Sequence, residues 1–297
     1  MDIQAIGASA TVAFFCAIAF ILAIKTWHAL ARVLSGQPSF ADSIMSESAQ
    51  RFRDELKSLS RRQSTYVGAA LVFGIMFAAA ALLEGPALFG GYPEWQLYLV
   101  FAALLAAAVF AAFRLTRTIL RSRQARFLHD ANLAIGHQLQ RIAVGHGCTY
   151  HDVPTADGII DHVLIGQNGI YAVTVIARRR WRKGEVRLYV NELRFSTSGE
   201  PYSVIRATAG AQRFARECRH LAGRPVRVRS VIAVPGWEIS AQTGHEHLLV
   251  NERNLAMMRG WRDRGDYLMD EEADAIQQEL TRRCSRRALL RTRLRTA

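Results

Sequence analysis

Three uncharged apolar blocks among the first 113 residues constrain the fold of this chain most strongly. They cover residues 5–24, 66–83 and 97–113, and each is close to the length of about 20 residues that a helix needs to cross a bilayer. Only Asp2 precedes the first block, which therefore lacks the basic region of a secretory signal peptide. We predict a three-span membrane region over residues 1–113. Two alternatives stay open: buried core helices of a soluble protein, or a first block that lies in the membrane interface.

The basic residues that flank the blocks predict the orientation. Seven lysines and arginines separate the first two blocks, arginines follow directly after the third, and residues 84–95 have none. The positive-inside rule places such basic segments in the cytoplasm. The sequence therefore predicts a multi-pass protein of the inner (plasma) membrane, with its N-terminus outside and residues 25–65 and the chain after Arg114 in the cytoplasm.

The segment between the first two blocks contains one candidate helix. Phe52, Leu56 and Leu59 have helical spacing within residues 46–60. The sequence leaves open whether this amphipathic helix lies on the membrane surface or packs on the soluble domain.

The net charge is uneven along the chain. The formal charge is +13, yet residues 1–113 hold seven basic and seven acidic residues, so the whole excess follows them. Such an excess favours anionic partners, either nucleic acid or the anionic inner leaflet. Solubility and membrane topology explain it equally well.

The four cysteines suggest neither disulfides nor zinc. Cys16, Cys148, Cys218 and Cys284 form no C-x-x-C pair and lie near no histidine at zinc spacing. They indicate isolated thiols in a reducing compartment.

A β-hairpin is the clearest local prediction in the second half of the chain. Apolar runs at 160–166 and 169–176 flank the turn Gln167-Asn168-Gly169, and Asn-Gly between apolar runs is a strong hairpin signal. The order of elements around it predicts an α/β domain with a mixed sheet. The other predicted elements are helices over 127–143, 201–222, 252–261 and 270–293, and strands over 148–153, 186–195, 226–234 and 248–250.

The hairpin resembles the nuclease-related domain (NERD) family. The resemblance rests on Ile160-Asp161-His162-Val163, on the strand Gly169–Val173 and on the downstream Trp181 and Gly184. It implies a restriction-endonuclease-like fold with a mixed central sheet. The NERD-like cytosolic domain is expected over residues 120–265, and a charged C-terminal helix or tail over 266–297.

The resemblance also implies a PD-(D/E)xK active site, in which two carboxylates hold Mg²⁺ and a lysine stabilises developing charge. Asp161 is the first carboxylate and the implied metal ligand. The second acidic position is Thr174 and the lysine position is Ile176, while the acid of the first helix falls near Asn132. No other cofactor is expected, and Mg²⁺ only if the site is active. We predict that catalysis is lost.

Compensation is the alternative. Arg178 lies two residues beyond Ile176 and is a candidate to replace the lysine charge, and Asp152, Asp157 and His162 are candidate ligands. Whether the chain is an enzyme therefore stays open; if it is one, it is a metal-dependent nuclease.

A basic run follows the hairpin, and its arginines and tryptophan suit phosphate contact and base stacking. A solvated loop, or contact with anionic lipid, explains the run equally well. Its residues are Arg178, Arg179, Arg180, Trp181, Arg182 and Lys183.

Three functions are consistent with these features. The first is a membrane-tethered, catalytically degenerate nuclease-like module that binds DNA or RNA. The second is a Mg²⁺-dependent nuclease that uses Asp161 with substitute ligands. The third is a membrane scaffold that binds a protein partner.

Overall fold

The computed structural model describes residues 3–34, 45–82, 94–144, 147–156, 158–179, 184–197, 200–261 and 263–285. The chain divides into two compact units. The first consists of Met1–Gly36 and Asp54–Ala125, and the second of Gln37–Arg53 and Arg126–Ala297. The second unit is therefore built from two stretches of chain that are far apart in sequence.

Long helices make up the first unit. They are α1 (Ile3–Leu34), α2 (Gln50–Leu82) from residue 54 onward, and α4 (Glu94–Ala143) up to residue 125. Within the described residues, two stretches are long and apolar enough to cross a membrane, Ser9–Ala31 and Ala102–Ala143. The second predicted span falls on α2, which does not meet this criterion in its described part, so that span stays a prediction.

Apolar side chains on these helices are exposed. None of the residues in the most apolar window of α4 is buried, and only 22% of those in the window of α1 are. Phe15, Leu71, Leu105 and Phe113 are each more than half exposed. A core helix of a soluble protein buries such side chains, and large exposed apolar patches mark surfaces that contact lipid or protein.

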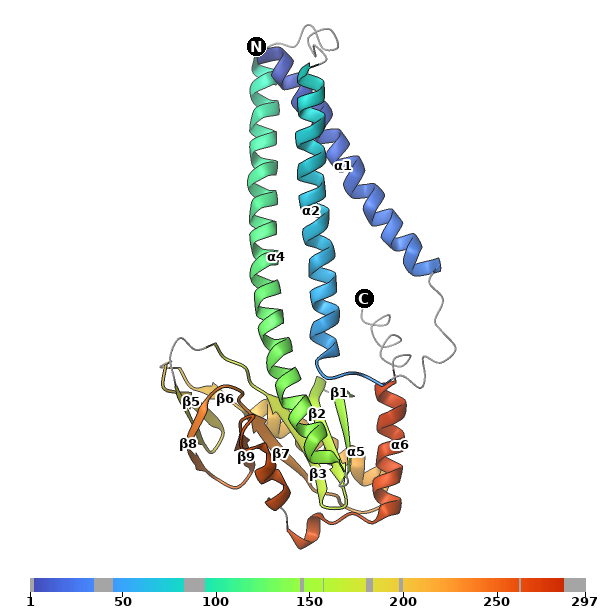
Figure 1. Cartoon of the computed structure of the whole chain (residues 1–297), viewed down its shortest axis with the longest axis vertical. Coiled ribbons are helices and arrows are strands. Elements are labelled where there is room, and N and C mark those ends of the chain that lie inside the picture. Colours follow the sequence, from blue (N-terminus) through green and yellow to red (C-terminus); the bar gives the residue numbers. More distant parts are fainter. Residues whose placement is uncertain are drawn as a thin grey trace. The chain divides into compact units, whose positions relative to one another are not determined.

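A five-stranded mixed sheet forms the centre of the second unit, in the order β1-β2-β3-β7-β9 (Figure 1). β1, β2 and β3 are antiparallel neighbours, whereas β3, β7 and β9 are parallel. The predicted hairpin is confirmed, since β2 and β3 pair up to Gly166 and Gly169. The bounds are β1 Cys148–Thr155, β2 Gly158–Gly166, β3 Gly169–Val175, β7 Val228–Ala233 and β9 His247–Val250.

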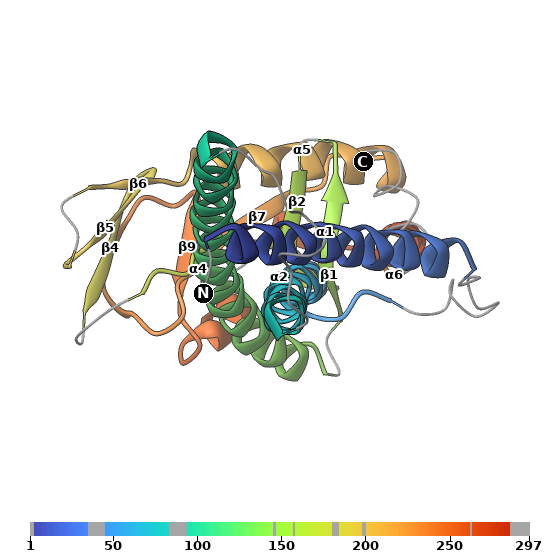
Figure 2. The same cartoon turned by 90° about the horizontal axis from the view of Figure 1, so that it is seen from above.

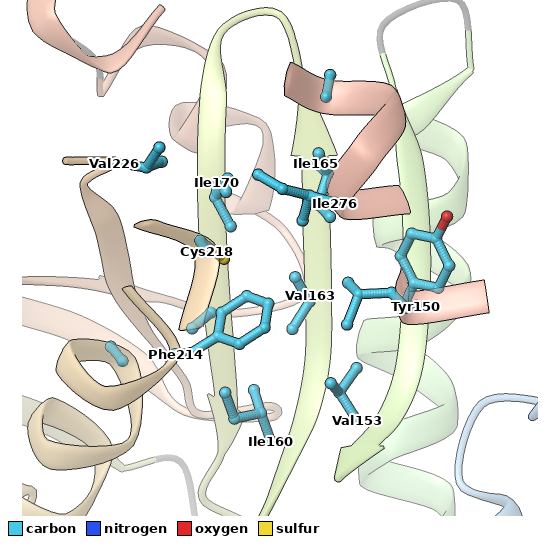
Figure 3. Packing of buried hydrophobic residues seen from close by; sticks show 14 of the residues in the cluster. Tyr150, Val153, Ile160, Val163, Ile165, Ile170, Phe214, Cys218, Val226 and Ile276 are labelled. Atoms are coloured by element: carbon cyan, nitrogen blue, oxygen red, sulfur yellow. The ribbon is translucent and has the colours of Figure 1, made fainter. Parts of the chain in front are cut away.

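Helices cover both faces of the central sheet, which explains why β2 and β3 read as nearly continuous apolar runs. One face packs against α5 (Ile205–Ala222) and α6 (Asp270–Cys284). Figure 3 shows Phe214 of α5 and Ile276 of α6 directed toward the strand residues of this face. The other face packs against the end of α4 and the 3₁₀ helix Leu255–Gly260. The expected α/β architecture with a mixed central sheet is confirmed.

A second, four-stranded sheet has the order β6-β5-β4-β8. In both views, β5 and β6 lie at the end of the central sheet opposite β1 and α6, and Figure 2 shows β4 beside them (Figures 1 and 2). Its core centres on Trp237, which is 1% exposed and packs edge-to-face on Phe195. The bounds are β4 Glu185–Tyr189, β5 Glu192–Phe195, β6 Tyr202–Ser203 and β8 Glu238–Thr243.

One strand prediction was wrong, and one strand was not predicted. The single strand expected over 186–195 is the hairpin β4–β5, because the chain turns at Val190 and Asn191, where Val190 has a φ of 50°. The strand β8 was not predicted, since most of its residues are exposed and it lacks an apolar run.

Several helix bounds also differ from the prediction. The helix expected over 127–143 is the end of the much longer α4, and α5 begins at Ile205 because Tyr202 and Ser203 pair with β5. The helix expected over 252–261 is the 3₁₀ helix Leu255–Gly260, preceded by a turn in which Asn251 accepts two backbone hydrogen bonds. The last predicted helix begins at Asp270 as expected; residues 286–293 of that prediction lie outside the described residues.

Candidate functional site

The structure places Asp161 beside the two positions with which the PD-(D/E)xK pattern pairs it. The β2–β3 ladder ends at the pair His162 and Val173. Next to this pair, Asp161 Oδ2 accepts a hydrogen bond of 2.8 Å from the backbone N–H of Val175, the residue between Thr174 and Ile176. The sequence-predicted centre is therefore assembled in space, with threonine and isoleucine at two of its positions.

Asp161 pairs with an arginine that the sequence did not suggest. Arg51 Nη2 donates to Asp161 Oδ1 at 2.5 Å. The backbone N–H of Arg51 donates to Asp152 Oδ2 at 2.9 Å, and its Nε lies 3.7 Å from Asp152 Oδ1. Both carboxylates therefore share one arginine. Arg51 precedes Asp161 by 110 positions, and no local pattern in its own segment indicated the contact.

Burial dominates the electrostatics of Asp161. Its side chain is only 9% exposed, and this desolvation raises the pKa of the Asp161 carboxyl. The Arg51 guanidinium and the hydrogen bond from Val175 lower that pKa and so offset part of the desolvation. Arg51 is the compensating charge for this carboxylate in the described part of the chain.

The residues around Arg51 dock on the second unit. We call Met45–Arg53 the docking segment. The Ser46 N–H donates to the carbonyl oxygen of Cys284, the Ser46 hydroxyl to that of His151, and the Ser48 hydroxyl to that of Asn132. Phe52 is 8% exposed. Of the two alternatives for this end of the amphipathic helix, the structure therefore shows packing on the domain.

Two buried histidines lie next to the docking segment. His151 Nδ1 and His162 Nδ1 are 2.8 Å apart, and Gln140 Nε2 lies 3.1 Å from His151 Nε2. Burial lowers the pKa of His151 to about 4 and holds the pKa of His162 well below its usual value. Both rings are therefore neutral near pH 7, and one Nδ1 donates to the other.

His162 lies near Gly136 of α4, and its Nδ1 faces His151. Within the described residues, no group of three or more His, Cys, Asp or Glu side chains is arranged to hold a metal ion. Asp157 lies outside the described residues.

A cavity of about 460 Å³ opens beside Thr174, between the hairpin and α5. Its polar lining comes from Thr155, Thr174, Arg206 and Arg213, and small residues of α5 complete the wall. Asp161 is not among the described residues that line it. Thr and Arg side chains offer hydrogen-bond donors, which suits an anionic ligand.

Ile176 and the described part of the basic run contribute to packing. Ile176 is 9% exposed in the core of the second sheet. The Arg178 guanidinium lies 5.0 Å from the Phe195 ring centroid and that of Arg179 lies 5.3 Å from Phe127. The described contacts of Arg178 do not include Asp161, and residues 180–183 lie outside the described residues.

Residues 128–235 match the family model of the nuclease-related domain, NERD. The NERD match begins in α4, ends just after β7, and includes Asp161, Thr174 and Ile176. It supports the resemblance seen in the sequence and indicates a nuclease-related module in this part of the chain. Arg51, β8, β9 and α6 lie outside the NERD match. No curated protein and no solved structure matches the chain.

Proposed function

We propose that this protein is a membrane-tethered nuclease-related module that binds nucleic acid without cleaving it. One observation carries the proposal: the carboxylate at the centre is compensated by Arg51 of the same chain, while the second acid and the lysine are replaced by Thr174 and Ile176. Mg²⁺ in phosphoryl-transfer sites is held by carboxylates together with substrate phosphate. A threonine and a buried isoleucine supply neither the second carboxylate nor the lysine charge.

The cavity and α5 support binding of a phosphate backbone. Arg206 and Arg213 line the cavity, and Arg216 and Arg219 continue along the exposed side of α5. Arginine and threonine donors are typical phosphate contacts in protein–nucleic acid complexes. The positive charge excess of the chain after residue 113 acts in the same direction.

The exposed apolar helices support the tether. The most apolar window of each candidate span holds at most two charged residues, while basic residues lie next to these windows on the side that we assign to the cytoplasm. The second unit then lies in the cytoplasm, where nucleic acid is accessible to it.

The test measures single-stranded DNA and RNA binding by the full-length protein in detergent, using fluorescence anisotropy between about 50 and 200 mM salt. We expect salt-dependent binding that weakens when Arg206 and Arg213 are both replaced by alanine. The salt slope is expected to fall by about 1.4, because two phosphate contacts to a single strand are lost.

The control removes two exposed arginines elsewhere, Arg194→Ala with Arg253→Ala, and retains full binding. Undetectable or salt-insensitive binding by the parent protein contradicts the proposal. Equal loss in the two double variants contradicts the assignment of the site.

A second candidate function is a nuclease that uses Asp161 with Asp152 as a substitute ligand. The observation in its favour is that both carboxylates approach the same arginine. This candidate requires cleavage of DNA or RNA in Mg²⁺ or Mn²⁺ that disappears in Asp161→Ala. Cleavage that is unchanged in that variant excludes it.

A further inference from the structure

We propose that the docking segment Met45–Arg53 blocks cation binding, because the Arg51 guanidinium takes the place of a divalent cation at Asp152 and Asp161. The inference goes beyond nucleic-acid binding and does not depend on it, because it concerns the two carboxylates and not the cavity beside Thr174. A side chain of the same protein occupies the position of the cation at these two carboxylates.

The Arg51 guanidinium occupies the space that a cation at Asp161 would need. Both oxygens of Asp161 are engaged, Oδ1 by Arg51 and Oδ2 by the N–H of Val175. Mg²⁺ binds carboxylate oxygens at about 2.0–2.1 Å, and Arg51 Nη2 already lies 2.5 Å from Oδ1. A cation at Oδ1 would overlap this nitrogen and would be repelled by its charge. Arginine and metal are therefore mutually exclusive here.

The docking segment packs closely against α4 at Gly136. A Cβ atom added at Gly136 of α4 would lie 2.0 Å from the Ser48 hydroxyl oxygen and 2.7 Å from its Cβ. Glycine within a helix is unfavourable relative to alanine. The close approach of Ser48 accounts for glycine at this position, since a methyl group would push the segment off α4.

The docking segment contacts several elements of the second unit. Met45 forms a β-bridge with Ser285 after α6, and Ser46 bonds to both α6 and β1. Arg51 lies in the first turn of α2, which continues without interruption to Leu82. Because the residues after Arg53 belong to the other unit, movement of that helix reaches Arg51 through the chain itself. Withdrawal of this first turn would remove Arg51 from both carboxylates.

The test uses Mn²⁺ alone as the probe, with full-length protein in detergent and detection of bound Mn²⁺ by electron paramagnetic resonance. Parent protein is expected to show no saturable Mn²⁺ site. Arg51→Ala and Gly136→Ala are each expected to gain one, and Asp161→Asn added to either is expected to abolish it. Gly260→Ala is the matched control, because a Cβ at this glycine meets no atom within 4 Å and it lies outside the cavity beside Thr174; it behaves as the parent does.

Two results overturn the inference. One is Mn²⁺ binding by the parent as tight as that by the variants. The other is absence of binding in a folded Gly136→Ala protein, which decides the question even if Arg51→Ala does not fold. Nucleic-acid binding measured on the same samples is expected to be retained in both variants, so a failure of this inference is distinguishable from a failure of the proposed function.

Discussion

Arg51 and Asp161 are unequal partners because they differ in exposure. The Arg51 side chain is 31% exposed, whereas that of Asp161 is 9% exposed. Arg51 can therefore exchange its partner for water, but Asp161 cannot. The pair illustrates that the effect of breaking an ion pair depends on which charge is left behind.

This asymmetry predicts unequal effects of two substitutions. Arg51→Ala leaves a buried carboxylate without a counter-charge and is expected to lower the free energy of unfolding by about 3–5 kcal/mol. Asp161→Asn leaves a partly hydrated guanidinium and is expected to cost only about 1–2 kcal/mol. Urea unfolding of both variants in detergent measures the difference. Equal losses would contradict the assigned burial.

The buried histidines predict a loss of stability in acid. The folded state holds the pKa of His151 at about 4 instead of 6.5, so the unfolded chain binds more protons between these two values. Stability is therefore fully present above about pH 6.5 and falls as the pH drops toward 4. At pH 5 the loss from His151 alone is about 2 kcal/mol.

Thermal unfolding in detergent at pH 7 and pH 5 measures this effect. His151→Gln, which removes the titrating group, should flatten the pH dependence. Burial also raises the pKa of Asp161, which acts in the opposite direction at lower pH because the folded state then binds the extra proton. A stability that rises between pH 7 and pH 5 would contradict the histidine assignment.

At the residue scale, local patterns located only part of the site. Asp161, Thr174 and Ile176 were assigned through the resemblance to the NERD family, and the Asn168–Gly169 turn predicted that they lie on neighbouring strands. Arg51 was missed because its contact depends on tertiary packing across 110 positions. Asp152 was named as a candidate ligand, but its contact with Arg51 was missed for the same reason.

At the scale of elements, the four-stranded sheet depends on one close approach. Gly184 precedes β4, and a Cβ added there would lie 2.6 Å from the Trp237 ring. Trp237 is itself fixed by a hydrogen bond of 3.0 Å from its Nε1 to the Arg178 carbonyl oxygen. This contact explains why residue 184, downstream of Trp181, is a glycine. The Trp237 indole occupies the space that a side chain at residue 184 would need.

Gly184→Ala is therefore expected to destabilise the second sheet. Overpacking of a filled core costs about 1–3 kcal/mol, and the loss should concentrate in β4 and β8, which pair next to this residue. Hydrogen–deuterium exchange measures it as faster exchange in these strands, with little change in β2. Gly236→Ala is unsuitable as a control because its φ is 79°. Gly260→Ala, where a Cβ meets nothing within 4 Å, is suitable.

The elements that were predicted have local sequence signals, whereas the elements that were missed do not. The hairpin β2–β3 has a turn dipeptide and two apolar runs, all local. The alternation of residues 186–195 continues across Val190 and Asn191, so the turn between β4 and β5 left no break in the pattern. β8 pairs only with β4 in its sheet and exposes most of its side chains, so burial imposed no apolar period on it.

At the scale of the whole molecule, the second unit is not one continuous segment. The expected domain boundary near residue 120 separates the Asp161 centre from Arg51, although Gln37–Arg53 packs with Arg126–Ala297. A fragment that starts at residue 120 therefore lacks the docking segment. Composition and hydropathy could not show this, because they describe segments one at a time.

The cysteines predict a direct readout of topology. Cys148 is exposed, whereas burial raises the pKa values of Cys218 and Cys284 to about 12 and keeps both unreactive. A membrane-impermeant maleimide should therefore label Cys148 in inside-out vesicles and not in intact spheroplasts. Cys148→Ser should abolish the labelling. Labelling of Cys148 in intact spheroplasts would contradict the cytoplasmic location of the second unit.

The division of the second unit between two stretches of chain has a consequence for its biosynthesis. Translation delivers Met45–Arg53 to the ribosomal exit long before Asp152, Asp161 and Ser285 exist, and domains generally fold from the N-terminal side as synthesis proceeds. The nascent docking segment therefore has no binding surface while the rest of α2 and then α4 are synthesised. The contacts of Arg51 cannot form before Asp152 and Asp161 are made, and those of Met45 and Ser46 cannot form before the end of α6 has left the ribosome.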